Sequence, residues 1–154
     1  MEESSPELQR LIQFFETISQ QTVASLDQFY DAEAYFKDPF NEVHGVAAIQ
    51  GIFRAMFEQV EDPRFKVNQA IQGTGRQDLS HKSNDAFLIW EFTFGFKRFK
   101  RGQIQRVRGS SHIRFDQTGK IVFHRDYWDA AEELYEKIPV LGALFRFLRR
   151  QAQH

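Results

Sequence analysis

The first half of the chain places apolar residues at helical spacing. Between Pro6 and Tyr30, apolar positions recur at steps of three and four: Leu8, Leu11, Ile12, Phe15 and Ile18. This period is typical of an amphipathic helix. Ser5 and Pro6 suit its cap and first turn.

Two further helices follow from the same pattern. A short one is predicted to begin near Thr22 and to end before the extended piece 34–39, where Asp38-Pro39 breaks the chain. The run 44–60 repeats the apolar spacing, and Glu61-Asp62-Pro63 marks its end. It predicts a third helix.

After Pro63 the pattern changes from helical to extended. Four β-rich runs are separated by Gly, Asn, Asp and Gln, and they cover residues 65–75, 85–99, 105–116 and 119–129. They predict a four-stranded antiparallel meander. Two connections, Lys100-Arg101-Gly102 and Asp116-Gln117-Thr118-Gly119, carry hairpin chemistry.

The last segment, residues 131–154, has helical composition interrupted by Pro139. Its second half alternates apolar residues with Arg146, Arg149 and Arg150, which indicates an amphipathic basic helix. Such a helix can pack on its own domain, on a second subunit or on a membrane surface. We expect packing on protein.

Composition narrows the class of protein. The 154 residues match one domain, contain no Cys and carry a net charge of −1 from 20 basic and 21 acidic residues. This balance provides no general attraction for nucleic acid, and no apolar stretch approaches the roughly 18 residues of a membrane span. No signal-peptide pattern opens the sequence, so the expected location is the cytoplasm.

The order of elements and the aromatic content suggest a pocket. Helices followed by consecutive strands are typical of an α+β fold with helices on one sheet face. The 17 Phe, 2 Trp and 4 Tyr exceed what a core of this size requires, and aromatic residues line cavities well. We expect a strongly curved sheet with a cone-shaped apolar pocket beneath the helices.

Two motifs resemble one superfamily. The runs FYDAEAYFKDPFNEVHGVAAIQGIFRAMF (29–57) and HIRFDQTGKIVFHRDYWDAAE (112–132) are similar to ketosteroid-isomerase-like, SnoaL-like and limonene-epoxide-hydrolase-like members of the nuclear transport factor 2-like superfamily. The resemblance implies a cystatin-like α+β roll over residues 1–130, with 131–154 belonging to the same domain or to a dimer contact. That fold hosts enzymes, scaffolds and transport factors, so it does not choose the function.

Asp38 matches the general base of the steroid isomerases, within KDPF. A carboxylate desolvated among aromatic residues can shuttle a proton, but Asp38 can equally cap the turn before Pro39. The family's oxyanion donors correspond to Phe14 and Ser111, so that donor pair is missing. Ser111 with Tyr30 or Tyr35 does not reproduce it, and classical steroid isomerisation is not expected.

Asp126 matches an aspartate of the epoxide hydrolases, although the partner strand lacks their Arg-x-Asp. Strand alternation puts His124, Asp126 and Trp128 on one face, which the resemblance turns toward the pocket. His124 and Asp126 could act as an acid–base unit. Alternatively, His124 is a satisfied histidine of the sheet surface and Asp126 pairs with a base such as Arg108 or Arg125.

The candidate site residues therefore fall into two groups. The catalytic candidates are Asp38 and Asp126. Strand alternation puts Trp90 and Phe92 on one face, where they most simply form core and pocket wall. The expected ligand-binding residues are Phe14, Tyr30, Tyr35, Phe53, Phe57, Trp90, Phe92, Ser111, His124 and Trp128.

These observations leave two classes of function. One is a cofactor-free isomerase, cyclase or epoxide-opening hydrolase acting on an apolar small molecule through Asp38 and Asp126. The other is non-catalytic binding of an apolar ligand, or a homodimeric interaction module that pairs through the sheet face. The five histidines lack metal-ligand spacing, so no metal site is predicted. Nucleic acid is not an expected partner, and membrane contact by the tail is the less favoured use.

Overall fold

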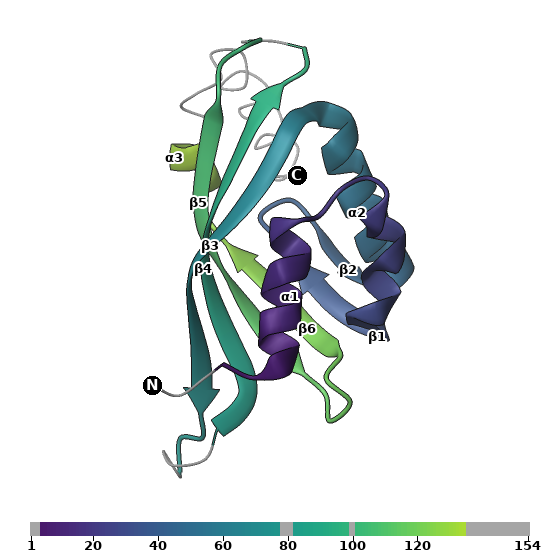
Figure 1. Cartoon of the computed structure of the whole chain (residues 1–154), viewed down its shortest axis with the longest axis vertical. Coiled ribbons are helices and arrows are strands. Elements are labelled where there is room, and N and C mark those ends of the chain that lie inside the picture. Colours follow the sequence, from purple (N-terminus) through teal and green to yellow (C-terminus); the bar gives the residue numbers. More distant parts are fainter. Residues whose placement is uncertain (1–3, 78–81, 99–100, 135–154) are drawn as a thin grey trace, which may run out of the picture.

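A computed structural model describes residues 4–77, 82–98 and 101–134 of the chain (Figure 1). Two short strands lie between the first helical elements and the helix α2, and four longer strands follow. In chain order the elements are α1 (Pro6–Glu16), the 3₁₀ helix η1 (Thr22–Gln28), β1 (Tyr30–Lys37), β2 (Glu42–His44), α2 (Val46–Gln59), β3 (Val60–Thr74), β4 (Lys82–Phe96), β5 (Gln105–Phe115), β6 (Ile121–Tyr127) and α3 (Ala130–Glu133).

The first helix has the predicted cap. Ser5 Oγ accepts a hydrogen bond from Leu8 N at 3.3 Å, and Pro6 occupies the first turn, where no intrahelical N–H bond is lost. The buried residues of α1 are Leu8, Leu11 and Phe15, the stripe read from the sequence. The second helix begins at Thr22 as predicted, but it has 3₁₀ rather than α geometry and ends at Gln28, and the strand that follows starts at Tyr30, before residue 34.

The sheet has six strands in the order β2-β1-β6-β5-β4-β3. The four strands from β3 to β6 form the predicted antiparallel meander, and β1 adds to its end by pairing in parallel with β6. Gly102 and Gly119 adopt positive φ angles of 79° and 85° in the hairpin connections, as their turns require.

Strand β3 begins earlier than the sequence predicts. Glu61-Asp62-Pro63 does not separate helix from strand, because α2 ends at Gln59 and β3 starts at Val60. The Pro-containing segment is instead an irregularity of the ladder, with a register shift between Glu61 and Arg64 and a positive φ of 47° at Asp62. A bulge accommodates the missing N–H of Pro63 within a strand.

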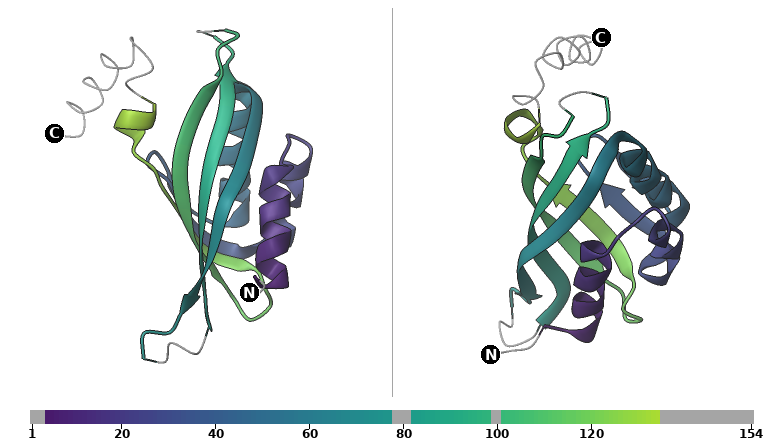
Figure 2. Two further views of the ribbon diagram at one scale, coloured as in Figure 1. Left: turned by 60° about the vertical axis from the view of Figure 1, so that its left-hand side comes forward. Right: turned by 45° about the horizontal axis from the view of Figure 1, so that its top comes forward.

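Helices α1 and α2 cover one face of the sheet, while α3 lies toward the opposite side (Figure 2). The buried core joins α1, η1 and α2 to the inner sheet face, where Leu88, Trp90, Phe92, Phe94 and Phe96 alternate along β4. This arrangement confirms the α+β roll. None of the described helices is long and apolar enough to cross a membrane. The predicted basic tail covers residues 131–154, and its part from residue 135 onward lies outside the described residues.

Candidate functional site

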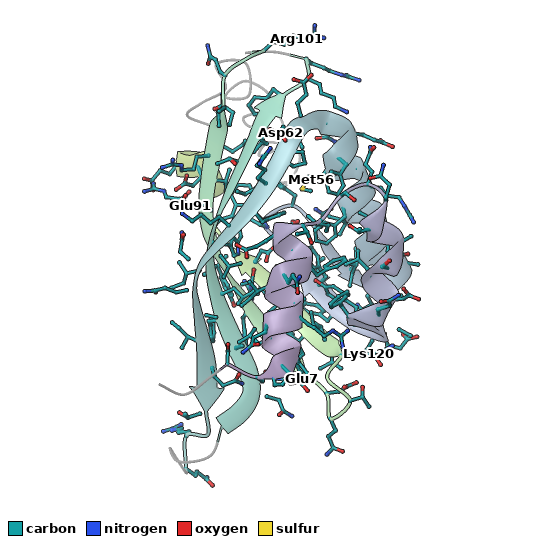
Figure 3. All side chains as sticks on the ribbon, viewed as in Figure 1. Glu7, Met56, Asp62, Glu91, Arg101 and Lys120 are labelled. Atoms are coloured by element: carbon teal, nitrogen blue, oxygen red, sulfur yellow. The ribbon has the colours of Figure 1, made fainter. Side chains whose placement is uncertain are left out.

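A cavity of about 480 Å³ lies among α1, α2, β1 and the four meander strands. Ten of its 24 lining residues are Phe or Trp, and they come from α1, β1, α2, β3, β4 and the connections that hold Phe40 and Trp128. Met56, labelled in Figure 3, joins the wall from α2. The polar lining residues are few: Asp38, Asn41, Gln59, Ser111, His124 and Asp126. A mostly apolar wall with a few polar groups is typical of small-molecule sites.

Five side chains from β1, β4, β5 and β6 form one hydrogen-bonded chain at this wall. Trp90 Nε1 donates to Ser111 Oγ at 2.8 Å, and Ser111 Oγ donates to Asp126 Oδ1 at 2.5 Å. On the other side of Asp126, His124 Nε2 lies 2.6 Å from Oδ1, and His124 Nδ1 lies 2.6 Å from Tyr30 Oη. Strand pairing explains why Ser111 and Asp126 are in contact, because the two residues lie opposite each other in the β5–β6 ladder.

Tyr30 determines which nitrogen of His124 carries the hydrogen. Tyr30 is 1% exposed, and burial, followed by the charge of Asp126, raises its pKa well above the ordinary value. The phenol therefore keeps its proton, for which Nδ1 is the acceptor in the described structure. Both ring nitrogens of His124 are hydrogen-bonded when Tyr30 Oη donates to Nδ1 and Nε2–H donates to Asp126 Oδ1.

Only one carboxylate oxygen of Asp126 accepts hydrogen bonds from the described residues. Both of its hydrogen bonds end on Oδ1, and Oδ2 receives none from any described residue. The side chain retains 19% exposure in the cavity wall. Arg108 is not its partner, because that guanidinium pairs with Glu132 and Glu133. The alternative of an Asp126–Arg108 ion pair is therefore wrong.

Asp38 also lines the cavity, but its carboxylate organises the turn after β1. Oδ1 accepts from Phe40 N and Asn41 N, each at 2.7 Å, and Asn41 Nδ2 lies 3.1 Å from both carboxylate oxygens. These contacts correspond to the turn-capping alternative. Asp38 therefore faces the cavity as a carboxylate already engaged by neutral donors.

Gly109 is a structural requirement of the site that sequence reasoning missed. It pairs with Trp90 in the β4–β5 ladder. A Cβ at this position would lie 2.6 Å from Trp90 Cη2 and 3.0 Å from Trp128 Cβ. Only glycine leaves room for the indole to lie across β5 and reach Ser111. The sequence signal was a glycine inside an otherwise regular strand.

An ion pair between the buried Glu133 and the exposed Arg108 joins the short helix α3 to β5, which the sequence did not reveal. Arg108 Nε donates to Glu133 Oε1 at 2.8 Å, and Glu133 is 6% exposed. The next residue, Leu134, joins the cavity wall. The pair therefore positions the end of the described chain beside the cavity.

The structure brings only part of the predicted ligand set to the cavity. Phe53, Trp90, Phe92, Ser111, His124 and Trp128 line it. The other four residues are absent from the described lining. Phe14 packs against Phe29 with ring centroids 4.2 Å apart, and Tyr35 stacks on Phe123 and donates to Glu42.

The remaining two residues lie behind the wall. Phe57 is buried in the core one turn after Phe53, and Tyr30 supports His124 from below the cavity surface. His124 itself is 3% exposed on the inner face, so the alternative that placed it at the sheet surface is wrong. The described residues contain no group of three or more His, Asp or Glu side chains arranged to hold a metal ion.

Solved structures share this fold. An NTF2-like protein of unknown function from Exiguobacterium sp. 255-15 is 18% identical, with a TM-score of 0.63 covering 80% of this chain and 98% of that one. A hypothetical protein with a ketosteroid isomerase-like fold from Catenulispora acidiphila, in complex with trimethylamine, is 11% identical, with a TM-score of 0.66 covering 86% and 92%. At these identities the likeness concerns the fold alone.

A third solved structure is an LEH-like epoxide hydrolase of M. tuberculosis. It is 14% identical, with a TM-score of 0.60 covering 90% of this chain and 87% of that chain. No curated protein matches the chain in sequence. The family model of the SnoaL-like domain matches residues 11–124, which include most of the roll and reach His124 of the hydrogen-bonded chain. The chain therefore belongs to the SnoaL-like domain family.

Proposed function

We propose that the protein is a cofactor-free acid–base enzyme that moves a proton between two carbon positions of an apolar small molecule, with Asp126 as the base. The observation that carries the proposal is the state of the Asp126 carboxylate. Oδ1 is anchored by Ser111 and His124, while Oδ2 has no donor among the described residues. A carboxylate fixed in this way presents one oxygen at a defined position in an apolar wall, as a general base requires.

The proposed reaction balances without a co-reactant. Asp126 Oδ2 takes a proton from a carbon next to a carbonyl group, and the electron pair of the C–H bond moves onto the carbonyl oxygen. The protonated carboxyl group then returns the same proton to another carbon of the conjugated system. The product is an isomer. Where the carbanion instead attacks a second carbonyl, the carboxyl group returns the proton to the alkoxide that forms, and the product is a cyclised isomer.

The Trp90–Ser111 and Tyr30–His124 pairs hold the base from two sides. Each pair delivers one donor to Oδ1, so that oxygen is fixed from two sides and Oδ2 is left for the substrate. Trp90 and His124 are themselves 7% and 3% exposed. Their packing fixes the carboxylate in one orientation.

The contacts of Asp38 favour one-base chemistry over epoxide opening. Epoxide opening by a carboxylate needs an acid that protonates the leaving oxygen while the base activates water. Asp38 accepts two backbone N–H bonds on one oxygen and the Asn41 amide on both. Both carboxylate oxygens of Asp38 are thus engaged within the turn, so neither is placed to deliver a proton to a leaving oxygen.

A neutral carbon acid with a spectroscopic product tests the proposal. The probe is 5-nitrobenzisoxazole, an apolar bicycle whose ring opens to a coloured phenolate when a base removes its carbon-bound proton. We expect catalysis by the wild-type chain and a loss of about 10²-fold or more in kcat/KM for Asp126→Asn, the usual range for a general base. Asp38→Asn keeps the turn acceptor Oδ1, and it should retain activity within a few-fold.

Equal rates for wild type and Asp126→Asn would overturn the proposal. Native mass spectrometry of the freshly purified proteins separates turnover from simple binding. A metabolite that accumulates in Asp126→Asn but not in wild type supports turnover by this carboxylate. Equal retention in both proteins favours the alternative function, which is to hold an apolar ligand without converting it.

A further inference from the structure

We infer that the ligand of this cavity carries a positively charged nitrogen on an otherwise apolar body. This inference shares with the proposed function only the assumption that the ligand binds in this cavity. Two carboxylates, Asp38 and Asp126, face that cavity, whereas none of its described lining residues is Lys or Arg. An ammonium group on the ligand supplies the missing counter-charge.

The hydrogen bonds of the two carboxylates support this reading. Every donor to Asp126 and Asp38 is a neutral group: a hydroxyl, an imidazole, two backbone amides and a side-chain amide. Neutral donors offset part of the cost of removing a carboxylate from water, but they bring no opposite charge. Two negative charges on one apolar cavity therefore favour a cation and disfavour an anion.

The nearest basic side chains are directed elsewhere. A shallower hollow shares Asp38, Asp126 and Trp128 with the cavity and also contains Lys37 and Arg125. The Lys37 ammonium lies 3.7 Å from a Glu42 carboxylate oxygen, and the Arg125 guanidinium lies 4.6 Å from the centroid of the Tyr127 ring. Both residues belong to the outer sheet face by strand alternation, opposite Phe36, His124 and Asp126.

Aromatic faces provide the second element of cation recognition. Trp128 and Phe40 line the cavity beside the two carboxylates, with their ring centroids 5.5 Å apart and their planes at 73°. Ammonium groups are attracted to the faces of such rings, most strongly to tryptophan, and the attraction increases when water is excluded. The apolar walls formed by β4 and α2 then accommodate the remainder of the ligand.

A positive charge on the substrate also compensates for donors that the cavity lacks. Ser111 gives its hydrogen to Asp126, and Phe14 packs outside the described lining, so neither stabilises a developing enolate. An ammonium group near the reacting carbon makes its C–H bond more acidic and stabilises the negative charge that forms. The ligand class and the one-base chemistry are thus compatible.

The test uses three probes of equal chain length and different charge: octyltrimethylammonium, octanol and octanoate. Binding to the full chain is followed by isothermal titration calorimetry, with fluorescence of Trp90 and Trp128 as a second signal. We expect the cation to bind about tenfold more tightly than the alcohol, and octanoate to bind most weakly. Asp38→Asn and Asp126→Asn should each lower cation affinity about fivefold and leave octanol binding within twofold.

Glu58→Gln is the matched control, because Glu58 is an exposed acid on α2 outside the described lining. It removes the same charge and should leave all three affinities unchanged. The inference is wrong if octanol binds as tightly as the cation, or if Glu58→Gln weakens cation binding as much as Asp38→Asn. The neutral benzisoxazole assay is independent of this result, so failure of the ligand class and failure of the catalytic proposal can be distinguished.

Discussion

Tyr30 Oη lies 2.6 Å from His124 Nδ1, although the two residues are 94 positions apart in the chain. Their rings are nearly parallel, with an interplanar angle of 10°. The contact exists because β1 joins the end of the meander by pairing in parallel with β6. The N-terminal part of the sheet therefore determines the tautomer of a histidine that holds the candidate base.

Replacing Tyr30 with Phe should weaken catalysis without changing substrate affinity. The buried Nδ1 loses its donor, which costs about 1–3 kcal/mol of unfolding free energy. His124 can then place its hydrogen on either nitrogen, so Asp126 is held less uniquely. We expect kcat on the benzisoxazole probe to fall about tenfold, a smaller effect than the general-base loss, with KM unchanged because Tyr30 lies behind the wall.

Tyr35→Phe is the control for that substitution. Its hydroxyl donates to the exposed Glu42 at 2.8 Å, far from the inner face. Unfolding in urea and steady-state kinetics should both match wild type closely. A Tyr30→Phe protein with wild-type kcat would show that the Tyr30–His124 contact serves stability alone.

The raised pKa of Tyr30 predicts an alkaline loss of stability. The folded state keeps the phenol proton above the ordinary pKa of about 10, whereas the unfolded chain loses it there. In that range the native state binds more protons, so the unfolding free energy falls as pH rises. The contribution is fully present below about pH 10 and is lost above it.

Comparing wild type with Tyr30→Phe isolates this group. The difference in unfolding free energy between the two proteins should be constant from about pH 8 to 9.5 and should shrink as pH rises past about 10. Denaturant titrations at each pH provide the measurement. A difference that stays constant to about pH 11.5 would contradict the assignment of a protonated, buried phenol.

Gly109→Ala should disturb the site more than its small size suggests. The new Cβ would lie 2.6 Å and 2.7 Å from two atoms of the buried Trp90 ring, which has to move. Overpacking of this kind costs about 1–3 kcal/mol. The movement also withdraws Trp90 Nε1 from Ser111, so near-ultraviolet circular dichroism and tryptophan fluorescence should change along with stability.

Gly51→Ala provides the opposite expectation within the same chain. Gly51 lies within α2, and an added Cβ meets nothing within 4 Å. Alanine favours the helix over glycine by roughly 0.5–1 kcal/mol, so this variant should be more stable than wild type. If Gly109→Ala were as stable as Gly51→Ala, the claim that Trp90 packs directly against Gly109 of β5 would be contradicted.

The elements of the fold were largely readable because each has its own local signal. The helical stripe of α1, its Ser5 cap and the Asp116–Gly119 turn are short-range features, and the structure confirms them. The parallel pairing of β1 with β6 was not predicted. Side-chain alternation along residues 30–37 shows that the segment is extended, but it does not identify the partner strand.

The site was less predictable because facing a cavity and facing the core give the same apolar pattern. Phe53 and Phe57 share one helical stripe, yet only Phe53 belongs to the described lining. Strand alternation grouped His124 and Asp126 on one face, the family resemblance turned that face toward the pocket, and both residues line the cavity together with Trp90. The directions of their hydrogen bonds depend on the β5–β6 register and on Gly109, which no local pattern reports.

A final prediction concerns the outer face of the sheet, which we propose pairs with a second copy of the chain. The exposed apolar residues on this face come from three strands: Ile71, Phe87, Ile89 and Tyr127. They alternate with inner-face residues, so one surface collects them opposite the cavity. Grouped exposed apolar residues of this kind mark interaction surfaces.

Sedimentation equilibrium over a concentration series tests the pairing. Wild type should show twice the chain mass of 18.2 kDa, and Ile89→Lys should dissociate to monomers because a buried lysine would lack a partner. Ile104→Lys is the control, since Ile104 is 83% exposed in the β4–β5 connection rather than on the sheet face. A monomeric wild type, or equal dissociation by Ile104→Lys, would exclude this face as the dimer contact.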